Sequence, residues 1–244
     1  MKQGKFEMIG NTFLTESVLE MKLKGDTSGF TAPGQFVELS VPGHFLRRPI
    51  SVCDLEGDVL TLIYKVVGGG TSFLSGMRDG ELDALTGLGN GYDTSVSGDR
   101  PLLLGGGVGV PPLFLLARKL LGEGRQVQVV LGFNRKEEIF YEDRFREIGC
   151  EVLVTTADGS SGIRGFVTDA MKDLDYSCFY SCGPLPMLRA VFAQSRSSGQ
   201  FSLEERMGCG FGACMGCSIM TNAGAKRVCR EGPVFRKEEL PWQI

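Results

Sequence analysis

Short runs of alternating hydrophobic and polar residues fill roughly the first hundred positions of the chain. Glycine and proline separate these runs, a pattern typical of the strands of a small antiparallel β-barrel. The predicted strands cover residues 5–9, 12–22, 35–41, 50–54, 59–66 and 81–88. A short helix over residues 72–76 is predicted between the last two strands.

A different pattern begins at Leu102, where apolar strand-like runs alternate with stretches of helical periodicity. The predicted strands are 102–105, 127–133, 151–156 and 178–182, and the predicted helices are 111–121, 137–148, 167–172 and 185–197. This alternation predicts a parallel sheet covered by helices on both faces. We therefore predict a β-barrel domain at 1–98, an α/β domain at 99–200 and a small C-terminal segment at 201–244.

Composition and charge exclude several classes of partner and of catalytic chemistry. The 244 residues are 42% hydrophobic and 23% charged, as in a soluble globular protein, and the net charge of −3 favours neither nucleic acid nor an anionic membrane as partner. The first ten residues lack the apolar core of a signal peptide, so a cytoplasmic location is expected. His44 is the only histidine, which leaves little room for imidazole acid–base chemistry. We expect cofactors to supply the chemistry.

Four of the eight cysteines, Cys209, Cys214, Cys217 and Cys229, follow the spacing C-x4-C-x2-C-x11-C near the C-terminus. The first three spacings match the plant-type 2Fe–2S pattern, and neighbouring glycines allow a tight loop whose backbone N–H groups approach the sulfur atoms. Structural zinc is the alternative. It is disfavoured because three ligands crowd one loop, whereas zinc ribbons usually present two C-x2-C knuckles. A disulfide framework is disfavoured in a chain with no export signal.

The cysteines Cys53, Cys150 and Cys178 lie among apolar neighbours and are interpreted as small buried side chains. Within the cluster segment, Phe211, Ala213 and Met215 lie between the ligands without any charge among them. Some of these three side chains are therefore expected to form an apolar contact surface for a partner.

Two strand-to-helix turns of the second domain are candidates for nucleotide binding. Residues 105–112 read GGGVGVPP, and residues 182–187 read CGPLPM. Such glycine-rich turns direct backbone N–H groups at a pyrophosphate, and parallel strands place them at the same sheet edge. The first run is not GxGxxG, and no acidic residue closes the next strand to hold a ribose 2′-hydroxyl. A tight turn without a ligand therefore stays an alternative.

The barrel domain offers a second candidate phosphate site. Residues 47–51, RRPIS, enter a strand with a cation and a hydroxyl, and residues 68–72, GGGTS, open the short helix. An arginine beside a helix N-terminus would neutralise a diphosphate. Taken alone, each motif slightly favours the alternative, a surface arginine pair and an ordinary turn.

Together, the motifs RPIS, YKVVGGGTSFL, TGLGNGY, GGGVGVPP and CGPLPM resemble the flavin reductases of the ferredoxin–NADP reductase superfamily. The C-terminal SLEERMGCGFGACMGC and RVCREGPVF are similar to the electron-transfer subunits of class 1B dihydroorotate dehydrogenases. The resemblance covers nearly the whole chain. It implies a flavin-binding barrel, a nicotinamide-nucleotide domain and a 2Fe–2S segment.

The resemblance also implies roles for individual residues. FAD would be bound by Arg48, Pro49, Ile50, Ser51, Ile63, Tyr64, Lys65, Gly70, Thr71 and Ser72. The nicotinamide dinucleotide would be bound by Gly105, Gly106, Gly107, Gly109, Cys182, Gly183 and Pro184, and the four cysteines Cys209, Cys214, Cys217 and Cys229 would hold the cluster. The residues alone leave NAD and NADP open, since Arg135, Lys136 and Arg164 could meet a 2′-phosphate, and the resemblance favours NAD.

These cofactors suit a converter between two-electron and one-electron chemistry. A nicotinamide exchanges two electrons as a hydride, a 2Fe–2S cluster takes one, and a flavin links them. The resemblance implies a partner, an FMN-containing subunit that oxidises dihydroorotate, in a two-plus-two heterotetramer of pyrimidine biosynthesis. A subunit of a related oxidoreductase, of the sulfide dehydrogenase or ferredoxin–nicotinamide reductase type, is one alternative. A zinc-stabilised nucleotide-binding regulator is another.

Overall fold

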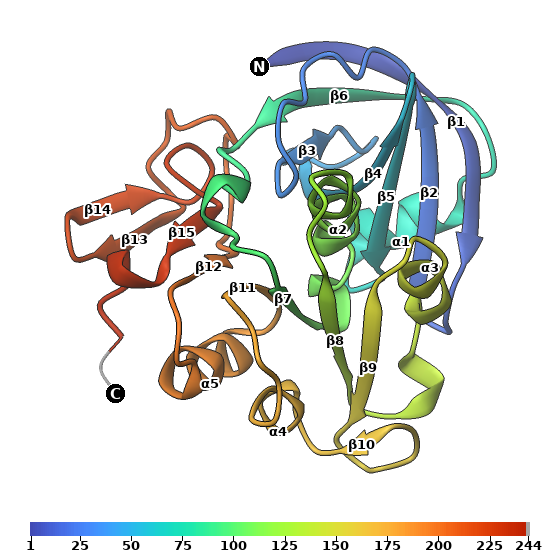
Figure 1. Ribbon diagram of the computed structural model, residues 1–244. Coiled ribbons are helices and arrows are strands. Elements are labelled where there is room, and N and C mark those ends of the chain that lie inside the picture. The colour runs from blue at the N-terminus through green and yellow to red at the C-terminus, as the bar shows by residue number, and fades with distance from the viewer. Residues whose placement is uncertain (243–244) are drawn as a thin grey trace.

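The computed structural model describes residues 1–242, and Figure 1 shows a barrel, a sheet domain and a C-terminal segment packed together. Six antiparallel strands close the barrel in the order β1-β2-β5-β4-β3-β6. These strands are β1 (Lys2–Phe13), β2 (Val18–Lys24), β3 (Phe36–Leu39), β4 (Arg48–Glu56), β5 (Val59–Lys65) and β6 (Glu81–Leu88). Helix α1 (Gly69–Gly76) lies between β5 and β6, as predicted, and begins three residues earlier than expected. The predicted barrel is confirmed.

The break predicted between the first two strands is wrong. Residues on both sides of Gly10 form one continuous strand, β1, and the chain turns only after Phe13. The pairing of β1 with β2 shifts register between Met8 and Gly10, so Ile9 is the extra residue of a bulge and Gly10 stays paired with Lys22. The amide of Asn11 donates to the carbonyls of Leu74 and Met77 at 2.8 and 3.1 Å, which ties this part of β1 to α1.

The second domain contains a seven-stranded sheet in the order β10-β9-β8-β7-β11-β12-β15, and all its strand pairs are parallel except β12 with β15. The strands are β7 (Pro101–Gly106), β8 (Gln128–Phe133), β9 (Glu151–Thr156), β10 (Ile163–Arg164), β11 (Cys178–Cys182), β12 (Gly199–Ser202) and β15 (Val234–Arg236). The helices are α2 (Pro112–Gly122), α3 (Glu142–Glu147), α4 (Val167–Met171) and α5 (Leu185–Gln194). The parallel-sheet prediction is confirmed, although β10, β12 and β15 were not predicted.

Helix α3 is shorter than the predicted helix over 137–148, because the backbone at Tyr141 is not helical. This residue has a left-handed φ of 68° and is buried, and its hydroxyl donates to Glu20 of β2 at 2.7 Å. The contact with the barrel outweighs local helix propensity. Residues Lys136–Glu138 form a separate 3-10 turn, η3, before the helix.

Two further features place the domains. Arg118 of α2 forms an ion pair with Asp54 of β4 at 2.5 Å, which joins the sheet domain to the barrel. The C-terminal segment adds a hairpin, β13 (Ser218–Thr221) with β14 (Gly224–Arg227), and returns to the sheet through β15. The boundary expected between residues 200 and 201 falls within β12. Within residues 1–242, the helices are too short or too polar to cross a membrane.

Candidate cofactor cleft and cluster segment

One cleft of about 670 Å³ is lined by residues from all three parts of the chain. The barrel contributes Phe36, Pro49, Ser51 and Lys65; the sheet domain contributes, among others, Gly106–Gly109 and Cys182–Pro184; and the region from β12 onward contributes Ser202–Glu205 and Pro233. Flavin-type and nucleotide-type motifs that are far apart in the sequence therefore face one space. Each part, taken alone, would leave this space open.

The two glycine-rich turns touch each other through their backbones. A Cβ on Gly109 would lie 2.5 Å from the nitrogen of Gly183, and one on Gly106 would lie 3.1 Å from Cδ of Pro184. Gly107 has a φ of 52°, in the left-handed region that favours glycine. The cradle therefore depends on the absence of side chains, and its exposed N–H groups suit a pyrophosphate. Gly105 does not line it, because that residue packs against Val110 and Leu113.

On the barrel side, the guanidinium of Arg48 covers the N-terminal turn of α1. A Cβ on Gly70 would lie 2.8 Å from Cζ of Arg48. Thr71 stabilises the turn, since its hydroxyl accepts hydrogen bonds from the nitrogens of Val67 and Gly68 at 2.9 and 3.2 Å. The next residue, Ser72, is exposed. The guanidinium of Arg48 and the N-terminus of α1 thus lie together, as the sequence predicted. The charge of the guanidinium and the positive end of the helix dipole suit a diphosphate.

Strand alternation separates the other predicted flavin residues into two sets. Pro49, Ser51 and Lys65 line the cleft, whereas Ile50 and Tyr64 point into the barrel core. Ile63 is 4% exposed and packs in the core beneath the sheet domain. The hydroxyl of Tyr64 donates to Asn11 at 3.1 Å, and burial raises its pKa. Ile50, Ile63 and Tyr64 therefore do not reach the cleft, and they could support a flavin ring bound there only by packing beneath the strands that line it.

Sequence reasoning missed several polar residues of the cleft, among them Asn134, Glu138 and Thr155. The nitrogen and side-chain amide of Asn134 donate to Oε2 of Glu138 at 3.4 and 2.9 Å. The carboxylate thus lies at the end of β8, although Glu138 follows the strand by five residues. The predicted helix over 137–148 concealed this position, whereas the observed turn η3 directs the residue into the cleft. Thr155 gave no signal beyond its place at the end of β9.

The four cysteines of the C-terminal segment approach one another as two pairs. The side chains of Cys209 and Cys214 contact each other in the loop, and those of Cys217 and Cys229 contact each other at the base of the β13–β14 hairpin. Within residues 1–242, no three Cys, His, Asp or Glu side chains converge as ligands of a single metal ion. Cys209 also lies close enough to Cys229 to raise the pKa of that thiol, so the two pairs neighbour each other, which suits a centre in which two irons each take two thiolates. A tetrahedral zinc site needs all four ligands at one point.

Backbone N–H groups surround the sulfur atoms. Sγ of Cys209 accepts from the nitrogens of Ala213 and Cys214 at 3.2 and 3.4 Å, and Sγ of Cys217 accepts from the nitrogen of Cys229 at 3.4 Å. Burial opposes ionisation of Cys209, but these donors outweigh burial and lower its pKa to about 6. These donors therefore favour the thiolate of Cys209, the form in which cysteine binds a metal, whereas burial raises the pKa of Cys229 to about 12. The three cysteines predicted to be buried, Cys53, Cys150 and Cys178, are confirmed as buried.

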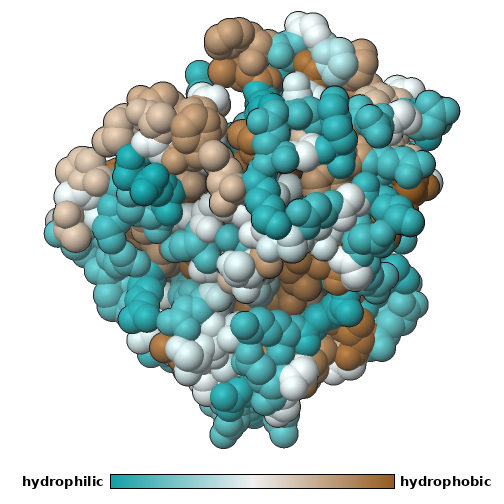
Figure 2. All heavy atoms as spheres, turned by 90° about the horizontal axis from the view of Figure 1, so that it is seen from above, coloured by the Kyte–Doolittle hydropathy of each residue, from teal (hydrophilic) through white to brown (hydrophobic). Residues whose placement is uncertain are grey.

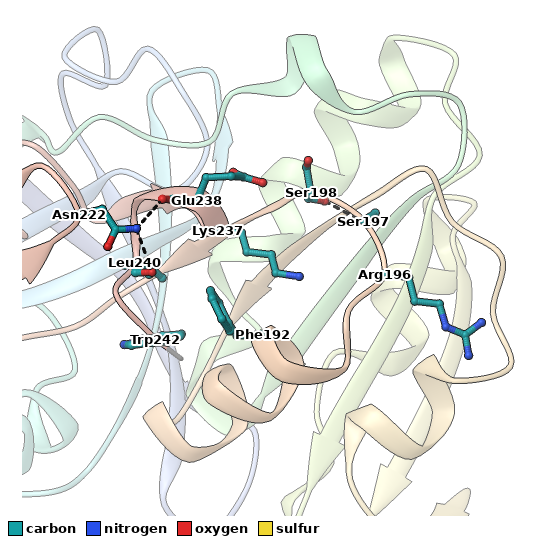
Figure 3. A pocket seen from close by; sticks show the side chains of 9 residues that line it. All are labelled: Phe192, Arg196, Ser197, Ser198, Asn222, Lys237, Glu238, Leu240 and Trp242. Atoms are coloured by element: carbon teal, nitrogen blue, oxygen red, sulfur yellow. Dashed lines mark hydrogen bonds between the residues drawn. The ribbon is translucent and has the colours of Figure 1, made fainter. Parts of the chain in front are cut away.

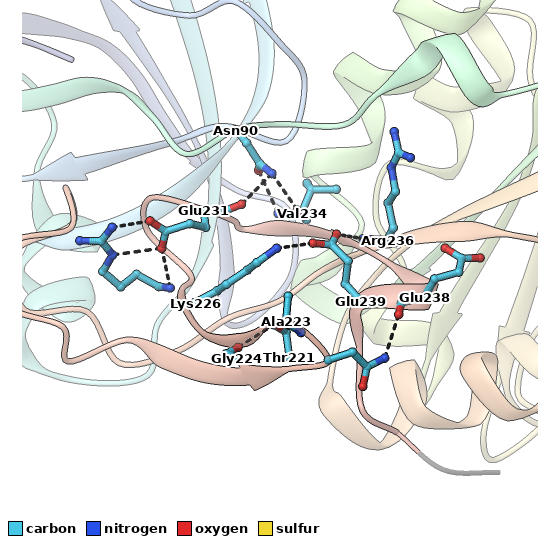
Figure 4. A network of polar contacts seen from close by, with 12 residues as sticks. Asn90, Thr221, Ala223, Gly224, Lys226, Glu231, Val234, Arg236, Glu238 and Glu239 are labelled. Carbon is cyan, nitrogen blue, oxygen red and sulfur yellow. Dashed lines mark hydrogen bonds and ion pairs between the residues drawn. The ribbon is translucent and has the colours of Figure 1, made fainter.

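The cluster segment is anchored to the rest of the chain through Asn90, which follows β6. Figure 4 shows its amide between Glu231 and Val234, donating to their carbonyls at 3.0 and 2.8 Å. An ion pair between Lys226 and Glu239, at 2.6 Å, joins the hairpin to the chain after β15. These contacts hold the β13–β14 hairpin against the sheet and against the residues that follow β6. Cys217 directly precedes this hairpin, and Cys229 follows it.

The loop around the cysteines exposes apolar side chains. Phe211, Met215 and Met220 are 40%, 53% and 66% exposed, and Cys214 is exposed between the first two. In Figure 2, apolar atoms gather on the side where Figure 1 places the cluster segment. The exposure predicted for this loop is confirmed, and neighbouring exposed apolar side chains of this kind are typical of a protein contact.

A second hollow, of about 470 Å³, lies between α5 and the chain after β15 (Figure 3). Lys237 faces it; its Nζ donates to Oγ of Ser195 at 2.8 Å and lies 5.3 Å from the ring centroid of Phe192. None of the site residues predicted from the sequence lines this hollow. Lys237 is therefore already satisfied by contacts within the protein.

Comparisons with known proteins agree with this arrangement. A family model described as the iron-sulfur cluster binding domain of dihydroorotate dehydrogenase B matches residues 204–241, and one described as an oxidoreductase NAD-binding domain matches residues 103–192. The curated dihydroorotate dehydrogenase B (NAD(+)) electron transfer subunit of Bacillus pumilus is 43% identical, covering 98% of both chains. That of Fusobacterium nucleatum is 41% identical, covering 94% of this chain and 95% of its own.

Among solved structures, an NADH-dependent reduced ferredoxin-NADP oxidoreductase superposes with a TM-score of 0.88 at 31% identity, covering 97% of this chain and 90% of that one. A ferredoxin NADP+ reductase from Neisseria gonorrhoeae, solved with FAD and NADP, gives 0.69 at 18% identity, covering 80% of this chain and 90% of that chain, and shares the fold alone. The whole-chain identities, the cysteine segment and the fold agree: the chain belongs to the family of electron transfer subunits of dihydroorotate dehydrogenase B.

Proposed function

We propose that the chain passes electrons from a dihydroorotate-oxidising partner, through a 2Fe–2S cluster and FAD, to NAD. One observation carries the proposal: a single cleft is lined by the flavin-type strands, the nucleotide-type turns and the region leading to the cluster. Electron transfer needs its centres close together, and cofactors bound along this cleft and in the neighbouring cluster segment would meet that need within one chain. The cofactors act as the chemical groups; the protein binds and orients them.

For FAD, the proposed residues are Arg48, Pro49, Ile50, Ser51, Ile63, Tyr64, Lys65, Gly70, Thr71 and Ser72. The diphosphate would meet Arg48 and the turn at Gly70, where a side chain on residue 70 would collide with the guanidinium. Pro49 and Ser51 would face the ring from the cleft, while Ile50 and Tyr64 would hold the strands from the core. When bound, FAD exchanges electrons singly or in pairs.

For NAD, the proposed residues are Gly105, Gly106, Gly107, Gly109, Cys182, Gly183 and Pro184. The pyrophosphate would lie on the N–H groups of the turn at Gly106–Gly109, which has room only for glycine at its contact with Gly183. Gly105 would contribute by allowing α2 to pack close to β7. Residues 1–98, 99–200 and 201–244 would thus form the FAD, NAD and cluster parts.

For the cluster, we propose that Cys209 with Cys214 holds one iron and Cys217 with Cys229 holds the other, following the two observed pairs. The same pairing argues against the zinc-stabilised regulator. The partner would be the FMN-containing catalytic subunit of the relatives' enzyme, in a two-plus-two assembly of pyrimidine biosynthesis in the cytoplasm. The relatives' name, "electron transfer subunit", implies such a catalytic partner.

A ferredoxin–nicotinamide reductase remains the competing function, favoured by the structural neighbour at 31% identity. The 43% identity to the dihydroorotate dehydrogenase relative and the match at residues 204–241 favour the first proposal. Expression with and without the candidate partner, followed by spectra and assays of flavin and iron, tests it. We expect about one FAD and two irons per chain; a colourless protein containing zinc would refute the proposal.

A further inference from the structure

We propose that Glu138 makes the nucleotide site selective for a dinucleotide whose adenosine ribose carries a free 2′-hydroxyl. This inference rests on the proposed binding of a nicotinamide dinucleotide in the cleft. It adds the residue that distinguishes the unphosphorylated cofactor from its 2′-phosphorylated form.

The sheet order places Glu138 beside the adenosine half of such a ligand. Strands are ordered β9-β8-β7-β11, and the pyrophosphate turn at Gly106–Gly109 follows β7. The barrel and the turn after β11 lie on one side of this turn, so a nicotinamide reaching the flavin strands occupies that side. The adenosine then extends the other way, over the ends of β8 and β9. Glu138 and Thr155 line the cleft at those ends.

The carboxylate of Glu138 is held in place and remains accessible. Oε2 accepts from the side-chain amide of Asn134 at 2.9 Å, and Oε1 lies 3.5 Å from Nε of Arg135. The side chain is 33% exposed, so it keeps lone pairs free toward the cleft. A carboxylate accepts the hydroxyls of a ribose diol but repels a phosphate at the 2′ position.

A second observation points to a polar ligand at the same edge. The hydroxyl oxygen of Thr155 is fully buried, and no hydrogen-bond partner for it exists among the described residues. Buried hydroxyls are nearly always paired, so this oxygen is expected to meet a ligand group in the cleft that Thr155 lines.

Two of the three cations named above as possible phosphate ligands are engaged by carboxylates, whereas Arg164 on β10 forms no ion pair among the described residues. Arg135 is paired with Glu138, and Nζ of Lys136 lies 4.0 Å from the carboxylate of Glu137. The nitrogen of Lys136 is fixed to Oγ of Ser160 at 2.8 Å, which holds the turn η3 in place. Removing the charge of Glu138 would release Arg135 toward a 2′-phosphate.

The test is equilibrium binding of NADH and NADPH to the holoprotein, followed by nucleotide fluorescence, for wild type, Glu138→Gln and Glu137→Gln. Glutamine can still accept from Asn134, so the turn should persist. Glu137 is the matched control, because it neighbours Glu138 and does not line the cleft. We expect Glu138→Gln to shift the NADH-to-NADPH affinity ratio at least tenfold toward NADPH. Adding Arg135→Ala should remove most of the NADPH gain, and Glu137→Gln should change the ratio less than twofold.

The outcomes separate this inference from the proposed function. If wild type binds NADH and Glu138→Gln leaves the affinity ratio unchanged, the role of Glu138 is wrong and the cleft assignment stands. An equal shift with Glu137→Gln would likewise overturn it, because a general charge effect would then suffice. If wild type binds neither nucleotide, the proposed function fails, and the inference fails with it.

Discussion

Gly210 of the cysteine loop lies directly against the buried carboxylate of Glu38 in β3. A Cβ on Gly210 would overlap that side chain, approaching its Cδ to 2.6 Å. Glu38 in turn pairs with Pro49 of β4, which lines the cofactor cleft. The loop that carries the first cysteine is therefore separated from a cleft-lining residue by a single strand.

Gly210→Ala should displace the cysteine loop. Gly210 has a φ of 73° and no room for a methyl group, so the variant combines backbone strain with a collision. Gly224→Ala is the matched control, because Gly224 has a φ of 97° but open space around it. We expect the Gly210 variant to lose iron. Its free energy of unfolding should be about 1–3 kcal/mol lower than that of the control. Equal losses in both would show that the contact with Glu38 has no effect.

The ionisation of Glu38 should make stability depend on pH. Burial raises its pKa from 4.5 to about 7, so the folded state binds more protons than the unfolded state between these values. The free energy of unfolding contributed by this group therefore falls as pH rises from about 4.5 to 7, by at most about 3 kcal/mol, and is constant above that range. Denaturant unfolding of wild type and Glu38→Gln at pH 5 and pH 8 measures this. We expect the free energy of unfolding of the variant, relative to that of wild type, to be higher at pH 8 than at pH 5. The same difference between the two proteins at both pH values would contradict the raised pKa of Glu38.

Arg48→Ala should weaken retention of FAD. Loss of a charge-assisted contact to a diphosphate costs about 1.5–3 kcal/mol, or about ten- to a hundredfold in affinity. Arg78→Ala is the control, since Arg78 donates to the carbonyls of Ser75 and Met77 at the other end of α1. The flavin-to-protein ratio after dialysis reports the effect. Arg48 would be an ordinary surface residue if its variant kept as much flavin as the control.

Cys214→Ser should remove or destabilise the cluster while sparing FAD, because the cysteine loop and the turn at Arg48 and Gly70 are separate parts of the fold. Cys150→Ala is the control, since Cys150 is buried away from the cluster segment. Iron content and visible absorbance give the measurement. Nicotinamide-driven reduction of artificial acceptors should persist. Survival of the cluster bands in serine variants of all four cysteines would refute the ligand assignment.

Phe211→Asp and Met215→Asp should disrupt partner binding while leaving iron and flavin content intact. Both side chains are exposed beside Cys214, and a charge placed in an apolar contact is costly to desolvate. Ile163→Asp is the control, because Ile163 is 39% exposed on β10, at the opposite end of the sheet from β15. Co-purification with the partner measures assembly. Normal assembly of both loop variants would move the docking face elsewhere, with the barrel as the next candidate.

Binding of the partner subunit to this chain should depend only weakly on salt concentration. The region 204–239 carries six lysines and arginines (206, 226, 227, 230, 236 and 237) and five acidic residues (204, 205, 231, 238 and 239), so its charges nearly balance. Simple charge attraction would weaken steeply with ionic strength. Affinity measured between about 50 and 300 mM salt, a range over which the Debye length falls by about half, separates the two cases. A change of more than about tenfold would indicate an electrostatic interface.

Local patterns in the sequence were sufficient to predict the barrel, the parallel sheet and an iron–sulfur segment near the C-terminus. Alternation and helical periodicity are local properties, and the cysteine spacing reflects the geometry of one loop. Tertiary contacts were not predictable in this way. Tyr141 interrupts the expected helix because its hydroxyl meets Glu20 on the barrel, 121 residues away in sequence. Asn11 lies within a strand because its amide bonds to α1.

The candidate site shows the same division. Glycine-rich turns are visible in sequence because their conformations require glycine, as at Gly107. Glu138 was missed because its position depends on where α3 begins, and that depends on the Tyr141 contact. The burial of Glu38 beneath Gly210 joins residues 172 positions apart and has no sequence signal.

The most direct test of the central claim is NAD reduction by dihydroorotate, using the purified complex of this chain with its candidate FMN-containing partner. We expect NADH to form only when both chains are present, and formation to cease with Cys214→Ser although the FAD remains bound. Dihydroorotate-driven NADH formation that persists in a complex shown to lack iron would contradict the account, because electrons would then reach NAD without the cluster.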